Sequence, residues 1–136
     1  MARPQPARYA GRMMTSHSAP HVALVDDDLD VRVGLQALLR SFGYRVSLYP
    51  GAQQFLDAGF SDIDCVVSDV QMPGMDGLEL LLRLRTGAAA PPCILMTAFT
   101  DAHIRARALR TGAACFLAKP IDAEELASCI ALATGR

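Results

Sequence analysis

Polar side chains that could do chemistry stand at the ends of four short apolar runs. The runs end at Asp26 and Asp27, at Asp69, at Thr97 and at Lys119. Proline or glycine follows closely after Asp69 and Lys119, which is typical of a buried strand that delivers a polar group to a loop. Asp69 is the only carboxylate at the end of its run, so we take it as the centre of the pattern.

The same runs alternate with segments of helical periodicity. We expect strands at 22–25, 44–48, 65–69, 93–97 and 114–118, and helices at 30–42, 50–58, 78–85, 101–110 and 122–133. Five strand and helix pairs with short connections favour a parallel sheet covered on both faces. Because crossovers are right-handed, the pattern predicts a doubly wound α/β sandwich.

The helix expected at 101–110 carries three arginines. We expect these arginines to face solvent or a partner, and three apolar residues to face the core. The arginines are Arg105, Arg107 and Arg110, and the apolar residues are Ala102, Ala106 and Leu109.

Ligands of a doubly wound sheet bind beyond the carboxyl ends of its strands, so the polar groups at these ends should converge. Carboxylates pressed together repel each other unless a cation lies among them. Ligands that are all oxygen favour Mg²⁺ over Ca²⁺, and Mn²⁺ could substitute. With the metal, Thr97 and Lys119 would bind phosphoryl oxygens. Asp69 then becomes a candidate nucleophile that forms an aspartyl phosphate.

Composition limits the alternatives. The chain has 136 residues, enough for one domain, and 51% of them are hydrophobic. With 13 basic and 14 acidic residues, it has no electrostatic signature of direct nucleic-acid contact. No apolar stretch approaches the ~20 residues of a membrane span. The four cysteines are widely spaced in apolar runs, which indicates buried thiols of a cytoplasmic protein.

Residues 1–20 have no periodicity, so we expect a disordered leader before a domain at 21–134. That domain resembles the receiver domain of a bacterial two-component response regulator. The resemblance rests on V-D-D-D at 25–28, S-D-V-Q-M-P-G-M-D-G at 68–77, L-M-T-A at 95–98 and A-K-P at 118–120. The D-x-x-M-P-x-M-D-G core, with the leucines at 81–84, is similar to the FixJ-like group. The resemblance implies a flavodoxin-like, three-layer fold with five helices and the strand order 2-1-3-4-5.

The resemblance also implies a role for each site residue. Asp69 would be the phosphoacceptor, and Thr97 and Lys119 would contact the phosphate. The protein ligands of Mg²⁺ would be Asp69, Asp27 directly, Asp26 through water, and the backbone carbonyl of Gln71. We expect Asp28 to start a helix and Asp76 to lie in a turn, so neither is expected to bind the metal.

Two aromatic residues are expected to modify the switch. Phe116 stands where the family more often has tyrosine, and we expect its ring to move together with Thr97. Phe99 and Gln71 are expected to control the access of water to the phosphate. Because Phe99 is bulky and apolar, we expect slow self-hydrolysis.

The resemblance implies a sensor histidine kinase as the phosphate donor and control of transcription as the output. Phosphorylation is expected to promote a two-fold dimer through the fourth helix, fifth strand and fifth helix. The sequence leaves open whether a DNA-binding domain follows Arg136 in a longer protein. It gives no reason to expect membrane contact.

Two other functions compete with this hypothesis. A phosphatase of the haloacid dehalogenase type also uses an aspartate beside Mg²⁺, but it needs a second aspartate two residues later as general acid. Gln71 occupies that position. A receiver-like module that binds partners unphosphorylated is disfavoured because every charged site residue is present. We therefore expect self-catalysed phosphotransfer and slow self-hydrolysis, without turnover as an enzyme.

Overall fold

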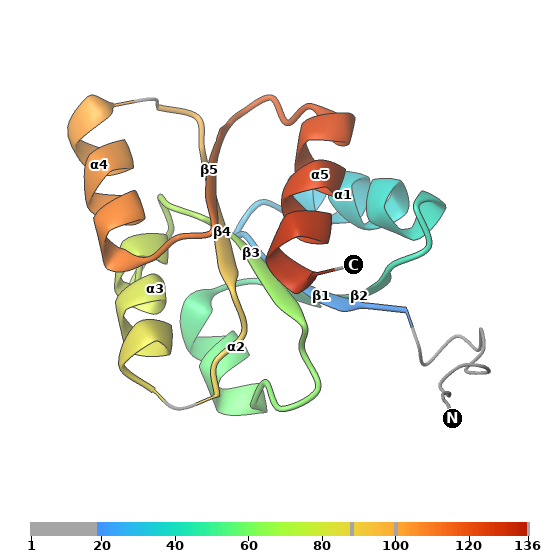
Figure 1. The fold of residues 1–136 in the computed structure, drawn as a ribbon, viewed down its shortest axis with the longest axis horizontal. Helices are drawn as coiled ribbons and strands as arrows, with labels where there is room; N and C mark the ends of the chain where they lie inside the picture. Colours follow the sequence, from blue (N-terminus) through green and yellow to red (C-terminus); the bar gives the residue numbers. More distant parts are fainter. Residues whose placement is uncertain (1–18, 88, 100, 136) are drawn as a thin grey trace.

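The computed structural model describes residues 19–87, 89–99 and 101–135, so residues 1–18 of the expected leader lie outside the described residues. Five strands alternate with five helices in this part of the chain (Figure 1). In chain order they are β1 (His21–Val25), α1 (Leu29–Ser41), β2 (Arg45–Tyr49), α2 (Ala52–Ala58), β3 (Cys65–Asp69), α3 (Gly77–Thr86), β4 (Cys93–Thr97), α4 (Ala102–Thr111), β5 (Cys115–Ala118) and α5 (Ala123–Thr134). None of the helices described is both long and apolar enough to cross a membrane.

The five strands form one parallel sheet with the order β2-β1-β3-β4-β5. This confirms the predicted doubly wound fold and its strand order. Every residue of β3 and β4 is buried, because both faces of these central strands are covered by helices. From β1 the chain continues to β2 on one side and then crosses back to β3 on the other side, so the order of the strand connections reverses between β1 and β3. A ligand crevice is expected at this point in such folds.

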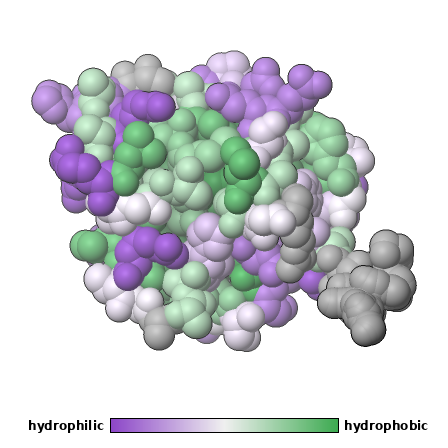
Figure 2. Space-filling model, in the orientation of Figure 1, coloured by the Kyte–Doolittle hydropathy of each residue, from purple (hydrophilic) through white to green (hydrophobic). Residues whose placement is uncertain are grey.

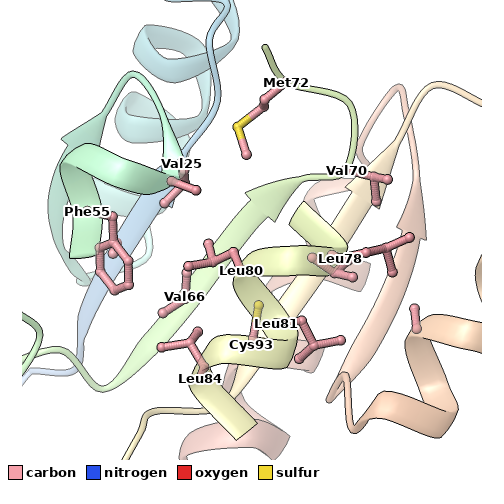
Figure 3. Packing of buried hydrophobic residues seen from close by; sticks show 14 of the residues in the cluster. Val25, Phe55, Val66, Val70, Met72, Leu78, Leu80, Leu81, Leu84 and Cys93 are labelled. Carbon is pink, nitrogen blue, oxygen red and sulfur yellow. The ribbon is translucent and has the colours of Figure 1, made fainter. Parts of the chain in front are cut away.

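Two hydrophobic layers hold the helices against the sheet. α1 and α5 pack on one face through residues such as Leu39 and Ile130, and α2, α3 and α4 pack on the other (Figure 1). Figure 3 shows the second layer, in which Leu80, Leu81 and Leu84 of α3 project towards the sheet. These leucines are at most 1% exposed, so burying each contributes about 1.5–3 kcal/mol.

Four aspartates outside the predicted site begin helices. The side chains of Asp28, Asp76, Asp101 and Asp122 each accept hydrogen bonds from backbone N–H groups in the first turn of α1, α3, α4 and α5. Such a cap stabilises a helix by roughly 0.5–2 kcal/mol. The helix-starting role predicted for Asp28 is confirmed, and the turn at Asp76 continues directly into α3.

The prediction for the inward face of α4 was wrong for Ala102 and Leu109, whereas Ala106 is half-buried. Ala108 is the buried residue of this helix and Ile104 packs beside it, whereas Ala102 is exposed and Leu109 is 43% exposed. Arginines lie on several sides of this alanine-rich helix, so its apolar stripe is too weak to fix the orientation from sequence alone. The three arginines are exposed, as predicted.

Candidate functional site

The register of the sheet brings the predicted site residues to one edge. Val25 pairs with Ser68, so Asp26, the next residue, lies level with Asp69. Asp69 in turn pairs with Met96, which precedes Thr97. Thr97 pairs with Ala118, and Lys119 follows it. The strand ends of β1, β3, β4 and β5 therefore place the predicted polar groups at adjacent positions.

Three of these side chains form an acidic cluster. Carboxylate oxygens of Asp26, Asp27 and Asp69 all lie within 4.8 Å of one another. Asp26 is 1% exposed and Asp69 is 6% exposed, whereas Asp27 is open to solvent. Like charges at this separation repel strongly in a buried site, so the cluster favours a positive charge among its members.

Lys119 supplies one such charge. Its Nζ lies 3.0 Å from Oδ2 of Asp26, to which it donates a hydrogen bond, and 3.5 Å from Oδ2 of Asp69. The Lys119–Pro120 peptide bond is cis. The ammonium group thus bridges the two buried carboxylates from the end of β5.

The pKa values at the site follow from this arrangement. Burial raises the pKa of Asp69 and the charge of Asp26 adds to the rise, which the nearby Lys119 only partly offsets. Burial alone would lower the pKa of Lys119, but its hydrogen bond to Asp26 and the charges of Asp69 and Asp26 raise it. A lysine with a raised pKa remains protonated at neutral pH, so it still holds the ion pair there.

Two hydrogen bonds and one close backbone contact at the site were not predicted from the sequence. Nη1 of Arg32 donates a 2.6 Å hydrogen bond to the backbone carbonyl of Asp26, and the Asp28 amide donates to Oδ1 of Asp26 over 2.9 Å. Gly77 packs so closely that an added Cβ would lie 2.3 Å from the carbonyl oxygen of Asp69. The only sequence signal for this approach is the glycine after Asp76 in the turn.

The side chain of Thr97 is fully buried, and its hydroxyl points towards the loop after β3. Oγ1 donates to Oε1 of Gln71 over 2.8 Å and lies 3.3 Å from the Phe99 carbonyl oxygen. The Phe99 amide donates to Thr97 Oγ1 over 3.1 Å. Thr97, Gln71 and Phe99 are thus brought together, although the ring of Phe99 is 69% exposed and most of its surface meets solvent.

The ring of Phe116 is already buried, with 8% of its surface exposed. The Arg105 guanidinium lies 6.0 Å from the ring centroid, and its Nη1 donates to the Phe116 carbonyl oxygen over 3.4 Å. The expected movement of this ring would therefore start from a buried position in this structure, and not from an exposed one. Arg105, on α4, is a contact of Phe116 that sequence reasoning missed.

The donor set of this edge suits a hard divalent cation. Asp26, Asp27 and Asp69 offer only oxygen atoms, which are the ligands that Mg²⁺ prefers. Among the residues described, none donates a hydrogen bond to the backbone carbonyl of Gln71, so this oxygen is free to act as a ligand. The individual roles of these residues in metal binding and phosphate transfer stay predictions at this point.

Comparisons with known proteins agree with this geometry. The family described as "Response regulator receiver domain" matches residues 22–131. The chain is 43% identical over 112 residues to the transcriptional regulatory protein FixJ of Bradyrhizobium diazoefficiens, covering 81% of this chain and 54% of that protein. It is 41% identical to FixJ of Azorhizobium caulinodans, covering 85% of this chain and 55% of that one. The chain thus spans about half the length of these curated relatives.

Solved structures give the same result for the fold. The crystal structure of FixJ-N superposes with a TM-score of 0.78 at 30% identity, covering 91% of this chain and 97% of that one. The response regulator StyR superposes with the same TM-score of 0.78 at 37% identity, covering 86% of this chain and 60% of that one. From its family match, its relatives and its fold, the chain belongs to the response regulator receiver domains and is similar to those of the FixJ type.

Proposed function

We propose that this receiver domain accepts a phosphoryl group on Asp69 with Mg²⁺ and switches the face formed by α4, β5 and α5. The observation that carries the proposal is the position of Asp69 within 4.8 Å of two other carboxylates and 3.5 Å from Lys119. A carboxylate between a cation site and an ammonium group can attack phosphorus, because positive charges on both sides stabilise the charge of the transferred group.

Each residue would have a distinct part in this reaction. Asp26, Asp27, Asp69 and the Gln71 carbonyl would hold Mg²⁺, directly or through water, and Mn²⁺ could replace it. The bound metal would neutralise charge on the phosphoryl oxygens. Lys119 already lies beside Asp69 and would move its hydrogen bond from Asp26 to a phosphoryl oxygen. No second carboxylate stands two residues after Asp69, which supports phosphate retention over phosphatase turnover.

The phosphate donor would be a sensor histidine kinase, and the output would be the control of transcription. Both follow from relatives named as transcriptional regulatory proteins, about twice as long as the segment they share with this chain. The chain's near balance of 13 basic and 14 acidic residues supports an indirect role, in which another part of the regulator contacts DNA.

The exposed charges of α4 and α5 support dimer formation on phosphorylation. Figure 2 shows hydrophilic residues gathered over α4 and over the beginning of α5. The α4 residues are Arg105, Arg107 and Arg110, and those at α5 are Asp122, Glu124 and Glu125. Complementary charges of this kind suit a two-fold interface in which each patch meets its opposite. Light scattering should show a larger particle after phosphorylation, and a monomer in both states well above micromolar concentration would contradict the dimer.

The proposed function is tested by incubating the chain with Mg²⁺ and a small-molecule phosphodonor such as acetyl phosphate. We expect intact-mass measurement to show one added phosphoryl group that depends on Mg²⁺. Continuous release of inorganic phosphate without a lasting mass change would favour the phosphatase. An unchanged mass with no phosphate release would favour a module that works unphosphorylated.

A further inference from the structure

The hydroxyl of Thr97 has a single proton to donate. In the structure this proton has two acceptors among the residues described, Oε1 of Gln71 at 2.8 Å and the Phe99 carbonyl oxygen at 3.3 Å. No hydrogen bond joins this hydroxyl to Asp69 in that part of the chain. The shorter contact assigns the proton to the side-chain amide of Gln71.

The two partners of this bond differ in their freedom to move. Thr97 is 0% exposed and ends a central strand, so its backbone is fixed by the sheet. Gln71 is exposed and lies in the loop after β3. Gln71 also lines a cavity of about 590 Å³, together with residues that include Met72, Ile104 and Arg107. This cavity leaves the amide room to turn away when Thr97 takes another acceptor.

We propose that the Gln71 side chain competes with the phosphoryl group for the Thr97 hydroxyl and so holds the unphosphorylated state. This rests on the proposed function, in which Thr97 contacts the phosphoryl group on Asp69. A charged phosphoryl oxygen is a stronger hydrogen-bond acceptor than a neutral amide oxygen. On phosphorylation the Thr97 hydroxyl therefore donates to the phosphoryl group in place of Gln71. Because the hydrogen bond to Gln71 is lost at the same time, the net free energy gained from the new hydrogen bond is smaller, and phosphoryl binding is weaker than it would be without Gln71.

This role makes Gln71 a positioning residue that acts through Thr97. It differs from the proposed metal contact of Gln71, which uses the backbone carbonyl and survives any side-chain substitution. It also differs from control of water access, which changes the rate of phosphate loss but leaves equilibrium binding of a phosphoryl analogue unaffected. The release of Gln71 would also alter the cavity beside α4, where Arg107 lies, and so links phosphorylation to that helix.

The test measures the affinity of the chain for beryllofluoride, a phosphoryl analogue, in saturating Mg²⁺ by isothermal titration calorimetry. Q71M keeps the length of the side chain but removes the acceptor. Loss of one competing hydrogen bond should tighten binding roughly 2- to 10-fold. In the T97V background, which has no hydroxyl, adding Q71M should not change the affinity. In the T97S background, the tightening should return.

Three results would overturn the inference while leaving the proposed function intact. These are equal or weaker binding by Q71M, the same tightening with and without the Thr97 hydroxyl, and an unchanged Gln71 side-chain amide signal in NMR spectra of the wild-type chain when beryllofluoride binds. The NMR measurement needs no variant, so it remains decisive if T97V does not fold. Failure of the wild-type chain to bind beryllofluoride at any Mg²⁺ concentration would instead overturn the proposed function, and this inference with it.

Discussion

The ionisable side chains at the two ends of the sheet differ in type and in their surroundings. At the amino end, β3, β4 and β5 each begin with a cysteine, namely Cys65, Cys93 and Cys115. Burial raises the pKa of Cys93 to about 12, so this thiol is neutral at physiological pH. At the carboxyl end, burial also raises the pKa of Asp69, but the ammonium group of Lys119 lies 3.5 Å away and partly offsets that rise.

Burial alone therefore does not make a functional site. All four buried polar side chains among the residues described lie at the carboxyl ends of β1, β3 and β4: Asp26, Ser68, Asp69 and Thr97. The cysteines fill core volume as small hydrophobic residues. The carboxyl end instead concentrates like charges that destabilise each other, which is a common property of functional sites.

The largest effect should follow from adding a side chain at Gly77, which lies in close contact with the backbone of Asp69. In Gly77→Ala the new Cβ would lie 2.3 Å from the Asp69 carbonyl oxygen and 3.0 Å from the Val70 Cα, so the backbone must shift. We expect a loss of roughly 1–3 kcal/mol in the free energy of unfolding, measured by urea denaturation.

Gly34→Ala is the matched control. Gly34 lies within α1, and an added Cβ there meets no atom within 4 Å. Because alanine favours helix more than glycine does, we expect a gain of about 0.5–1 kcal/mol. Equal losses for both variants would mean that the approach of Gly77 to Asp69 has no special importance.

Removal of the exposed carboxylate of the cluster should weaken metal binding. In Asp27→Ala we expect the affinity for Mg²⁺ to fall roughly tenfold or more, because a direct charged ligand is lost. Asp28→Ala removes the same charge one residue later but breaks the cap of α1, so it should lower stability and preserve Mg²⁺ affinity. Calorimetric titration with Mg²⁺ measures the affinity of both variants. Similar Mg²⁺ affinities of Asp27→Ala and Asp28→Ala would contradict the assignment of Asp27 as a metal ligand.

A smaller effect is expected in the pH dependence of stability. Because the folded pKa of Asp69 is raised, its charge destabilises the fold at neutral pH, and this penalty disappears as pH falls below the ordinary carboxylate pKa of about 4. Without Mg²⁺, Asp69→Asn should therefore unfold at a higher temperature than the wild type at pH 7. Thermal denaturation should show the two curves approaching each other towards pH 4, and a difference that is constant or opposite in sign contradicts this explanation.

The smallest effect concerns the lifetime of the phosphate. Phe99 is 69% exposed, so we expect its ring to shield the pocket only in part. Phe99→Ala should accelerate loss of the phosphoryl group only about 2- to 5-fold, since limited exclusion of water is removed. A timed decay of the phosphorylated chain measures this rate, and an equal or slower decay would contradict the role of the ring.

The sequence was sufficient to predict which polar residues gather at the carboxyl end of the sheet, because parallel strands bring their carboxyl ends to one edge whatever the detailed packing. Asp26, Asp69 and Lys119 lie where this rule places them. The inward face of α4 was not predictable, since its alanines do not distinguish core from surface. The hydrogen bond from Thr97 to Gln71 depends on the rotamer of an exposed side chain, and no periodicity reports that.

The role of Asp69 as phosphoacceptor is tested by identifying the residue that takes up the phosphoryl group. The wild-type chain and Asp69→Asn are incubated with Mg²⁺ and acetyl phosphate, and their intact masses are compared. Cys93→Ala, from the other end of the sheet, serves as a variant that should react like the wild type. We expect one phosphoryl group on the wild type and on Cys93→Ala, and none on Asp69→Asn. A phosphoryl mass on Asp69→Asn in similar yield would contradict this expectation.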